Sequence, residues 1–284
     1  MKTQYKHLLQ RTYLVLVFGF MYLPIAVLIA YSFNENKSRA VFTGFSLKWY
    51  ASLFHNEMIL SALGLSLVLA FVSAIIATVL GTLATIGINS MSRKAQLIIN
   101  NISYVPVVNP EIITGVSLML LFVIVQKMGI GGENGVFGWI TLLIAHITFN
   151  LPYVILNVMP KLQQMDPDLE EAALDLGCTP FQAFTKVVIH EIMPGIISGA
   201  LMAFTMSLDD FVISYFVTGS SFITLPVEIY NYTKKPLQPK IYALFTLLFL
   251  AILLVMVVMN LVQAGDERRR RQARGVFGKK GANA

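Results

Sequence analysis

Long stretches without charge set the first limit on what this chain can fold into. Four runs contain no Asp, Glu, Lys or Arg: 12–34, 59–92, 134–160 and 241–265. Each exceeds the roughly 20 residues that an α-helix needs to cross a hydrocarbon core about 30 Å thick. Two further apolar runs, with Glu111 inside the first and Asp209 and Asp210 inside the second, cover 95–126 and 192–227. The sequence therefore predicts six membrane-spanning segments.

Helices are the expected form of these segments, because none of the runs shows the alternation of polar and apolar residues found in barrel strands. With 56% hydrophobic and 13% charged residues, the chain lies outside the range of soluble domains. The first run follows basic residues, as a signal peptide would, but it is long and no small-residue cleavage site follows. We expect a retained anchor and an all-α polytopic protein with one transmembrane domain, 1–265.

The basic residues predict the orientation of the chain. Lys and Arg favour the cytoplasmic side in short loops. They precede the first run, follow the second at Arg93 and Lys94, and follow the last at Arg268 to Arg271. With six spans these places fall on one side, so both termini are expected in the cytoplasm, and the net charge of +6 needs no nucleic-acid partner. The basic tail, 266–284, is expected to anchor this topology, with binding to anionic lipid as the alternative.

The polar segment 161–191, between the fourth and fifth runs, carries the signals of two short cytoplasmic helices. Asp166 can cap the first helix, and Pro167 suits its first position. Gly177 supplies a left-handed stop, and a threonine before Pro180 repeats the start signal. Three acids place negative charge against the positive end of the first helix: Asp168, Glu170 and Glu171. A loop so well specified is expected to be a docking element.

Within this segment the sequence EAALDLG, starting at Glu171, resembles the EAA-x3-G signature of the membrane subunits of bacterial ABC importers. The resemblance implies a type I importer permease fold in the bacterial cytoplasmic membrane, with coupling helices that sit in a groove of an ATP-binding subunit. Where the family has a proline after this loop, the chain has His190, and Pro194 is expected to supply the break. The resemblance assigns coupling to Glu170, Glu171, Ala172, Ala173, Asp175 and Gly177.

Two other segments, 105–115 and 207–214, are similar to parts of spermidine/putrescine permeases. The second reads Ser-Leu-Asp-Asp-Phe-Val-Ile-Ser. The resemblance implies an alternating-access importer for polyamines. It also implies a second permease subunit, two ATP-binding cassette subunits and an extracytoplasmic polyamine-binding protein as partners. ATP and Mg²⁺ would bind to the ATPase subunits, so no cofactor is expected in this chain.

The acids inside the apolar runs are the candidate substrate ligands. A carboxylate near the bilayer centre costs roughly 2.5–3.5 kcal/mol on insertion scales, so it usually faces a cavity or a partner. Glu111, Asp209 and Asp210 lie at matched distances along two predicted helices. Tyr215 adds an aromatic face that suits an ammonium group. Successive helical residues point about 100° apart, so one aspartate is expected to face the pathway while the other makes a structural hydrogen bond. Glu111, just after a proline, either lines the pathway or stabilises a helix start.

Other chemistry finds little support. The four histidines lack the spacing of metal ligands, so no metal site is expected. No G-x-x-x-x-G-K-[ST] pattern, nucleophile or base is evident, so the chain is expected to be no enzyme and not to hydrolyse ATP itself. Two alternatives stay open: a permease for another small solute, such as iron or an oxyanion, and an ATP-independent cation transporter or channel. The docking loop argues against the second, and the buried acids argue against an oxyanion.

Overall fold

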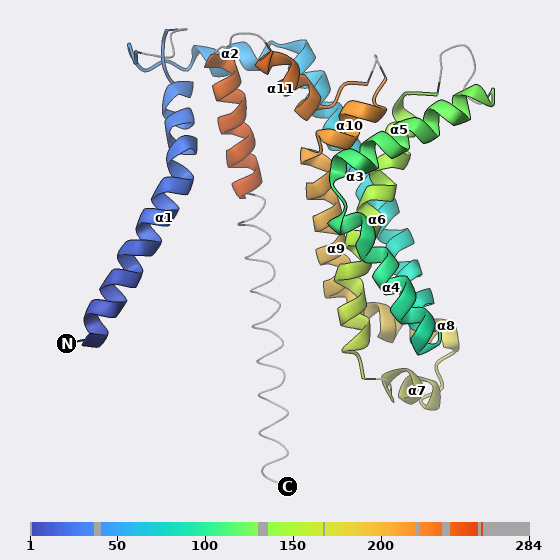
Figure 1. Cartoon of the computed structure of the whole chain (residues 1–284). Helices are drawn as coiled ribbons and strands as arrows, with labels where there is room; N and C mark the ends of the chain where they lie inside the picture. The colour runs from blue at the N-terminus through green and yellow to red at the C-terminus, as the bar shows by residue number, and fades with distance from the viewer. Residues whose placement is uncertain are drawn as a thin grey trace. The chain divides into compact units, whose positions relative to one another are not determined.

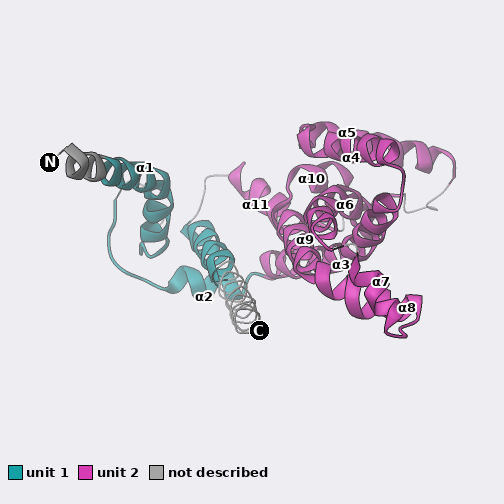
Figure 2. Ribbon diagram, turned by 90° about the horizontal axis from the view of Figure 1, so that it is seen from below, with its two compact units in different colours: residues 1–56, 235–284 teal, residues 57–234 magenta. Residues whose placement is uncertain are grey.

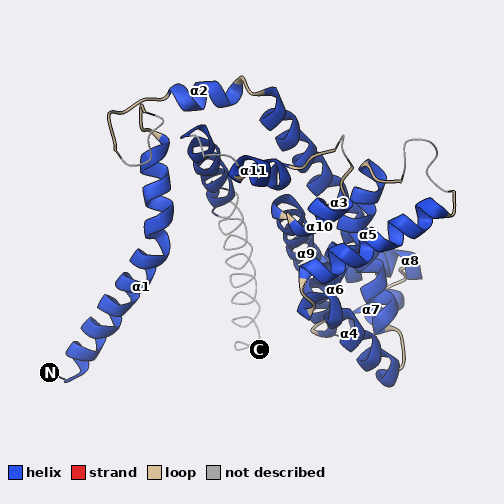
Figure 3. Cartoon of the chain, turned by 45° about the horizontal axis from the view of Figure 1, so that its top comes forward, coloured by secondary structure: helices blue, strands red, loops and turns tan. Residues whose placement is uncertain are grey.

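The computed structural model describes residues 2–36, 41–129, 136–166, 168–219, 222–234, 239–254 and 257. These residues form helices joined by loops, and no named strand occurs among them (Figure 3). Among the described residues, Asn34 and Phe45 form an isolated antiparallel β-bridge. The prediction of an all-α fold is confirmed.

Five of the six predicted spans lie within the described residues. Four are single helices long and apolar enough to cross a bilayer: Gln10–Ser32, Glu57–Asn89, Trp139–Gln163 and Pro180–Asp209. The first three belong to helices α1 (Lys2–Ser32), α3 (Glu57–Asn89) and α6 (Trp139–Gln163), and most of the fourth is α9 (Ile189–Asp209). The fifth is a bent pair of helices, α4 (Arg93–Val108) and α5 (Glu111–Lys127).

The sixth predicted span, 241–265, is only partly described. An apolar helix covers Pro239–Leu254, which is short for a bilayer on its own. The remainder of that span and the basic tail, 266–284, lie outside the described residues. The predicted count of six is therefore not confirmed in full.

The third predicted span, 95–126, is not one straight helix. Its two halves meet at 99°, with α4 ending at Val108 and α5 beginning at Glu111. Asn109 between them is extended, with ψ of 135°. The cause is Pro110, because a proline disfavours the helical conformation of the residue before it.

The fifth predicted span, 192–227, also differs from the expectation at both ends. Its helix ends at Asp209, and Asp210 is extended, with φ of −62° and ψ of 119°. Two short helices follow, α10 (Val212–Val217) and α11 (Leu225–Thr233). The segment after Asp209 is therefore a broken helix and not the outer part of one span.

At its other end this span starts earlier than expected, at Pro180. The short helix α8 (Pro180–Ala183) continues through a π-helical turn, η1 (Phe184–Val188), into α9. Pro194 lies inside α9, so the break expected there is absent and the chain runs as 30 helical residues to Asp209. A proline is tolerated inside a membrane helix because nearby groups and local π adjustments satisfy the freed carbonyl.

The chain divides into two compact units, residues 1–56 with 235–284, and Glu57–Lys234 (Figure 2). In the first unit, the loop after α1 is closed by side-chain hydrogen bonds. The Asn34 amide donates to the carbonyl of Val41 at 2.9 Å, and the Trp49 indole donates to the carbonyl of Asn34 at 2.7 Å. Trp49 lies on the short helix α2 (Lys48–Phe54).

The second unit is built on α3, α6 and α9, which pack side by side around buried apolar residues. Small residues allow the close approach, as in other membrane helix bundles. A Cβ added at Gly81 of α3 would lie 2.7 Å from the Val154 side chain, and one at Gly195 of α9 would lie 2.9 Å from the Asn157 carbonyl of α6. The core of the cluster is Ala74, Ala77, Val154, Val158, Leu162, Val188, Ile192 and Ala203.

The replacement Gly195→Leu is expected to destabilise this bundle by about 1–3 kcal/mol, because backbone on α6 cannot move aside without disturbing the core. The matched control is Gly64→Leu on α3, where no atom lies within 4 Å of an added Cβ. Thermal denaturation of the detergent-solubilised protein measures both variants. Equal midpoints for Gly195→Leu and the parent would contradict the packing.

Candidate functional site

The structure brings the three predicted acids together at two helix breaks. Glu111 is the first residue of α5, Asp209 is the last residue of α9, and Asp210 follows it. The carboxylate of Glu111 interacts electrostatically with both aspartates. We refer to these three residues as the acid cluster.

Helix packing, and not equal depth along straight helices, creates the acid cluster. The helices α5 and α10 are in contact, and a Cβ on Gly115 would lie 3.0 Å from the Phe216 ring and 3.5 Å from the Cα of Ile213. A side chain at this position, one turn beyond Glu111, would push against the Phe216 ring, so glycine favours the close approach. The helix breaks inside the predicted spans 95–126 and 192–227 therefore lie close together.

Asp210 has a structural role in this arrangement. Its side chain is buried, and the residue is 6% exposed. The carboxylate accepts hydrogen bonds from the backbone N–H groups of Ile213 at 3.2 Å and Ser214 at 2.7 Å. These are donors of the first turn of α10 that have no partner inside the helix. Asp210 thus caps α10 and is committed to it.

Asp209 has the opposite surroundings. It is exposed on unit 2, and it stands at the C-terminal end of α9. The last carbonyls of a helix carry partial negative charge, so an acid at this position weakens the helix, whereas a cation is favoured there. Carboxylate and helix end together make a site that suits a positively charged group.

An aromatic cluster lies directly after the acid cluster in the chain. The ring centroids of Phe211, Tyr215 and Tyr230 are 4.8 to 5.7 Å apart. The ammonium of Lys234 lies 4.6 Å from the Tyr230 centroid and 6.0 Å from the Tyr215 centroid. The two tyrosines therefore hold a primary ammonium within cation–π distance.

The helix α11 carries Tyr230 and is followed directly by Lys234, and a hydrogen bond links it to α3. The backbone N–H of Leu225, at its start, donates to the hydroxyl of Ser66 at 2.8 Å. The segment between the fifth and sixth spans thus folds back onto the bundle. Tyr230 and Lys234 are one helical turn apart, and this i, i+4 spacing was the available signal for the pair, which the sequence analysis missed.

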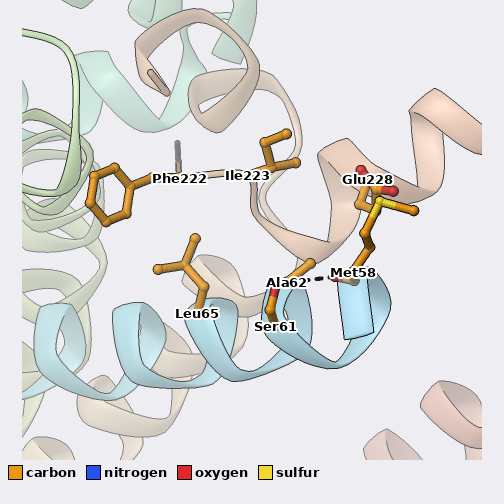
Figure 4. A pocket seen from close by; sticks show the side chains of 7 residues that line it. All are labelled: Met58, Ser61, Ala62, Leu65, Phe222, Ile223 and Glu228. Atoms are coloured by element: carbon orange, nitrogen blue, oxygen red, sulfur yellow. Dashed lines mark hydrogen bonds between the residues drawn. The ribbon is translucent and has the colours of Figure 1, made fainter. Parts of the chain in front are cut away.

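Another part of α11 borders a cavity of about 340 Å³ against the start of α3. Figure 4 shows the carboxylate of Glu228 beside Met58, with Leu65, Phe222 and Ile223 along the rest of the wall. The hydroxyl of Ser61 donates to the carbonyl of Met58 at 3.4 Å, so it is turned to its own helix. The cavity offers one acid and apolar walls, in contrast to the three acids at the helix breaks.

The docking loop lies at the opposite end of unit 2 from α10 and α11 (Figure 1). Its first helix is α7 (Asp168–Asp175). The carboxylate of Asp166 accepts the backbone N–H of Asp168 at 3.1 Å, and Gly177, with φ of +87°, ends the turn that follows. Pro167, expected at the first helical position, lies outside the described residues.

The second helix of the loop begins with a capping box. The hydroxyl of Thr179 accepts the backbone N–H of Gln182 at 3.3 Å, and the Gln182 side chain accepts the backbone N–H of Thr179 at 3.1 Å. Of the residues assigned to coupling, Ala173 is buried, on the helix α7 that packs against α8 and η1. The others are exposed: Glu170, Glu171, Ala172, Asp175 and Gly177.

Two apolar side chains of the loop stand out from the bundle, Leu176 at 86% and Phe181 at 75% exposed. Neither side chain was predicted from the sequence as a contact residue, although both flank the Gly177 turn. Large apolar groups this exposed on a polar loop are typical of a protein contact.

Family comparison decides what kind of protein carries these features. Residues 77–272 match the family described as binding-protein-dependent transport system inner membrane component. The matched range contains the acid cluster, the aromatic cluster and the docking loop. The chain belongs to this family.

The permease is similar along most of its length to two curated relatives. It is 38% identical over 261 residues to the putrescine transport system permease protein PotI of Escherichia coli K12, covering 90% of the permease and 91% of PotI. It is 34% identical over 262 residues to the spermidine/putrescine transport system permease protein PotC of the same strain, covering 92% and 96%. The predicted family is confirmed.

The fold of the permease is shared with a solved importer. A bacterial alginate ABC transporter in complex with an alginate pentasaccharide-bound periplasmic protein matches with a TM-score of 0.67 and 19% identity, covering 91% of the permease and 92% of that chain. Together with the apolar helices, these findings make the permease a multi-pass inner-membrane transport subunit and not an enzyme. Among its described residues, no three His, Cys, Asp or Glu side chains are grouped as a metal site would require.

Proposed function

We propose that the permease forms part of the translocation pathway for polyamines in an ATP-driven importer. The observation that carries the proposal is the ammonium of Lys234 within cation–π distance of the rings of Tyr215 and Tyr230. A polyamine carries the same primary ammonium groups, joined by methylene chains. Aromatic faces and carboxylates at separate positions can hold such groups in succession.

The acids distinguish this substrate class from the alternatives. Glu111, Asp209 and Asp210 repel an oxyanion, and each carboxylate costs free energy in an apolar bundle unless a cation or hydrogen-bond donor compensates it. The similarity to PotI and PotC supports an amine substrate for the permease. Family membership and the exposed docking loop support an ATP-driven importer over an independent cation carrier.

The proposed assembly contains one further permease subunit, two ATP-binding cassette subunits that bind ATP and Mg²⁺, and an extracytoplasmic polyamine-binding protein. Both termini and the loop 161–191 face the cytoplasm, where Leu176 and Phe181 enter the groove of an ATPase subunit. In this orientation α10 and α11 lie toward the outer side, where the binding protein releases its ligand.

Uptake of radiolabelled spermidine and putrescine tests the substrate class. Cells that lack the permease are expected to lose one or both activities, and a plasmid copy is expected to restore them. Unlabelled polyamines should compete, whereas oxyanions and neutral sugars should not. Unchanged polyamine uptake in the deletion strain would contradict the polyamine assignment and favour another small solute that permeases of this family carry.

The docking loop gives a separate prediction, in which Glu171→Lys and Phe181→Ala uncouple the ATPase from transport. Both side chains are exposed on the loop, so the replacements leave the bundle intact and remove one charged and one apolar contact. Co-purification with the ATPase is expected to fall roughly tenfold, since truncating an interface anchor typically costs 1 to 2 kcal/mol. The control is Glu57→Lys, the same charge reversal at the first residue of α3, outside the docking loop. Normal co-purification and coupled uptake of both loop variants would remove the docking assignment.

A further inference from the structure

A buried histidine joins the helices around the substrate site. His146 of α6 is 1% exposed. Its Nδ1 lies 2.6 Å from the hydroxyl of Ser207 on α9, and its Nε2 lies 3.0 Å from the hydroxyl of Ser214 on α10. Nε2 is also 3.6 Å from Asp210 Oδ2. The hydroxyl of Ser207 continues to that of Ser73 on α3, at 3.0 Å.

One tautomer of the ring fits the groups that face its two nitrogens. The Asp210 carboxylate accepts hydrogen bonds and has none to donate, so the ring nitrogen facing it, Nε2, is the one that carries the proton. Nδ1 then accepts the hydroxyl proton of Ser207, whose oxygen lies 3.0 Å from Ser73 Oγ; the Ser73 hydroxyl has one proton for both Ser207 and the carbonyl of Ala70, 3.2 Å away. A neutral ring therefore needs no rearrangement to be fully paired in an apolar interior.

Polar groups between membrane helices commonly form interhelical hydrogen bonds, each of which contributes little to stability. The position of His146 indicates a more specific role. Ser207 comes just before Asp209 on α9, and Ser214 lies beyond the break, on α10. The two nitrogens of one rigid ring thus connect the two sides of the break that carries Asp209, Phe211 and Tyr215.

We propose that His146 is a positioning residue for substrate, rather than a residue that touches it. By fixing the separation of the two helix ends, the imidazole sets the distance and angle between the Asp209 carboxylate and the aromatic cluster. Those two elements receive different ammonium groups of one polyamine, so their spacing selects among amines of different length. The inference rests on the proposed function and adds a determinant of specificity to it.

Two variants break the bridge from its two ends. His146→Asn keeps an amide near the Nδ1 position, next to Ser207, but does not reach Ser214. Ser214→Ala removes the α10 end of the same bridge. Ser73→Ala is the matched control, because it removes a hydroxyl of the network that contacts α9 alone and leaves the bridge across the break.

The measurement is the ratio of spermidine to putrescine transport rates at saturating binding protein, in proteoliposomes of the full transporter, normalised to the amount of permease. Both bridge variants are expected to change this ratio roughly three- to fivefold, the effect of one net hydrogen bond. The double variant should change it no more than either single variant, and Ser73→Ala should leave it unchanged.

The inference and the proposed function fail in different ways. If both amines lose rate equally, or only in proportion to the amount of folded protein, His146 is a structural fastening and the positioning role is overturned while polyamine transport stands. If the unmodified transporter moves neither amine, the proposed function itself is wrong. A ratio that changes as much in Ser73→Ala would also overturn the positioning role.

Discussion

Exchanging Asp209 for asparagine is expected to lower polyamine uptake roughly 10- to 100-fold, since a hydrogen bond to a charged group contributes about 1.5–3 kcal/mol. The variant removes the charge and keeps the shape. The side chain is exposed at the end of α9 and is not built into the packing, so the amount of permease in the membrane should not change. Removing an acid from a helix C-terminus should even stabilise α9 slightly.

Initial rates of radiolabelled spermidine uptake, normalised to permease in the membrane, measure this effect. Asp209→Glu is the control, because it restores the charge about one methylene further along. It should recover part of the activity. Full uptake by Asp209→Asn at normal expression would show that this carboxylate lies outside the pathway.

The sequence predicted the parts of the fold that depend on local signals. Charge-free runs predicted α1, α3 and α6, because the backbone polar groups of such a stretch must be hydrogen-bonded within the segment when lipid surrounds it, which a helix achieves. In the docking loop, Asp166 accepts a backbone hydrogen bond at the start of the first helix, as predicted for a cap. Gly177 adopts the left-handed conformation predicted for the stop. The EAA-x3-G resemblance identified the family, which residues 77–272 confirm.

The helix breaks were harder to predict, because hydropathy does not report backbone direction. The apolar runs continue through Pro110 and Asp210, and their lengths suggested straight spans. Pro194 suggested a break where tertiary packing keeps the helix intact. The acid cluster therefore formed for a different reason from the one expected: the bends bring Glu111 to Asp209, with Gly115 giving the approach.

His146 shows a second limit of sequence reasoning. A single histidine in an apolar run has no partner within helical reach, and the scattered histidines indicated only that metal binding was improbable. Its partners Ser207 and Ser214 are 61 and 68 residues away, so only the packing of α6 against α9 and α10 reveals the network. The same holds for Tyr230, which meets Phe211 across a loop.

One continuous helix connects the docking loop with the acid cluster. Residues Pro180–Asp209 run for 30 residues, or roughly 45 Å at 1.5 Å per residue, from the exposed Phe181 side to Asp209. A displacement of the loop by an ATPase subunit would therefore reach Asp209 through one helix. The π-helical turn Phe184–Val188 lies near the start of this helix, and such turns are frequent at functional sites.

The second large effect is expected at Asp210, and it concerns stability. Asp210→Ala leaves the backbone N–H groups of Ile213 and Ser214 without their acceptor in a buried site, and it removes the carboxylate that lies 3.6 Å from His146 Nε2. Each N–H group left unpaired is expected to destabilise unit 2 by about 1–3 kcal/mol. The denaturation midpoint of the purified permease and its amount in the membrane should both fall, and uptake per folded molecule should fall less than in Asp209→Asn.

Asp210→Asn separates the cap from the charge. An asparagine offers one oxygen to the N–H groups of Ile213 and Ser214 and turns an NH₂ group toward the other, so it is expected to recover about half of the lost stability. Stability is then expected to decrease from the parent to Asp210→Asn and further to Asp210→Ala. Uptake per folded molecule is expected to be lowest in Asp209→Asn. If Asp210→Ala were as stable as the parent but inactive, the two aspartates would have to exchange roles, because the buried carboxylate would then serve substrate and not α10.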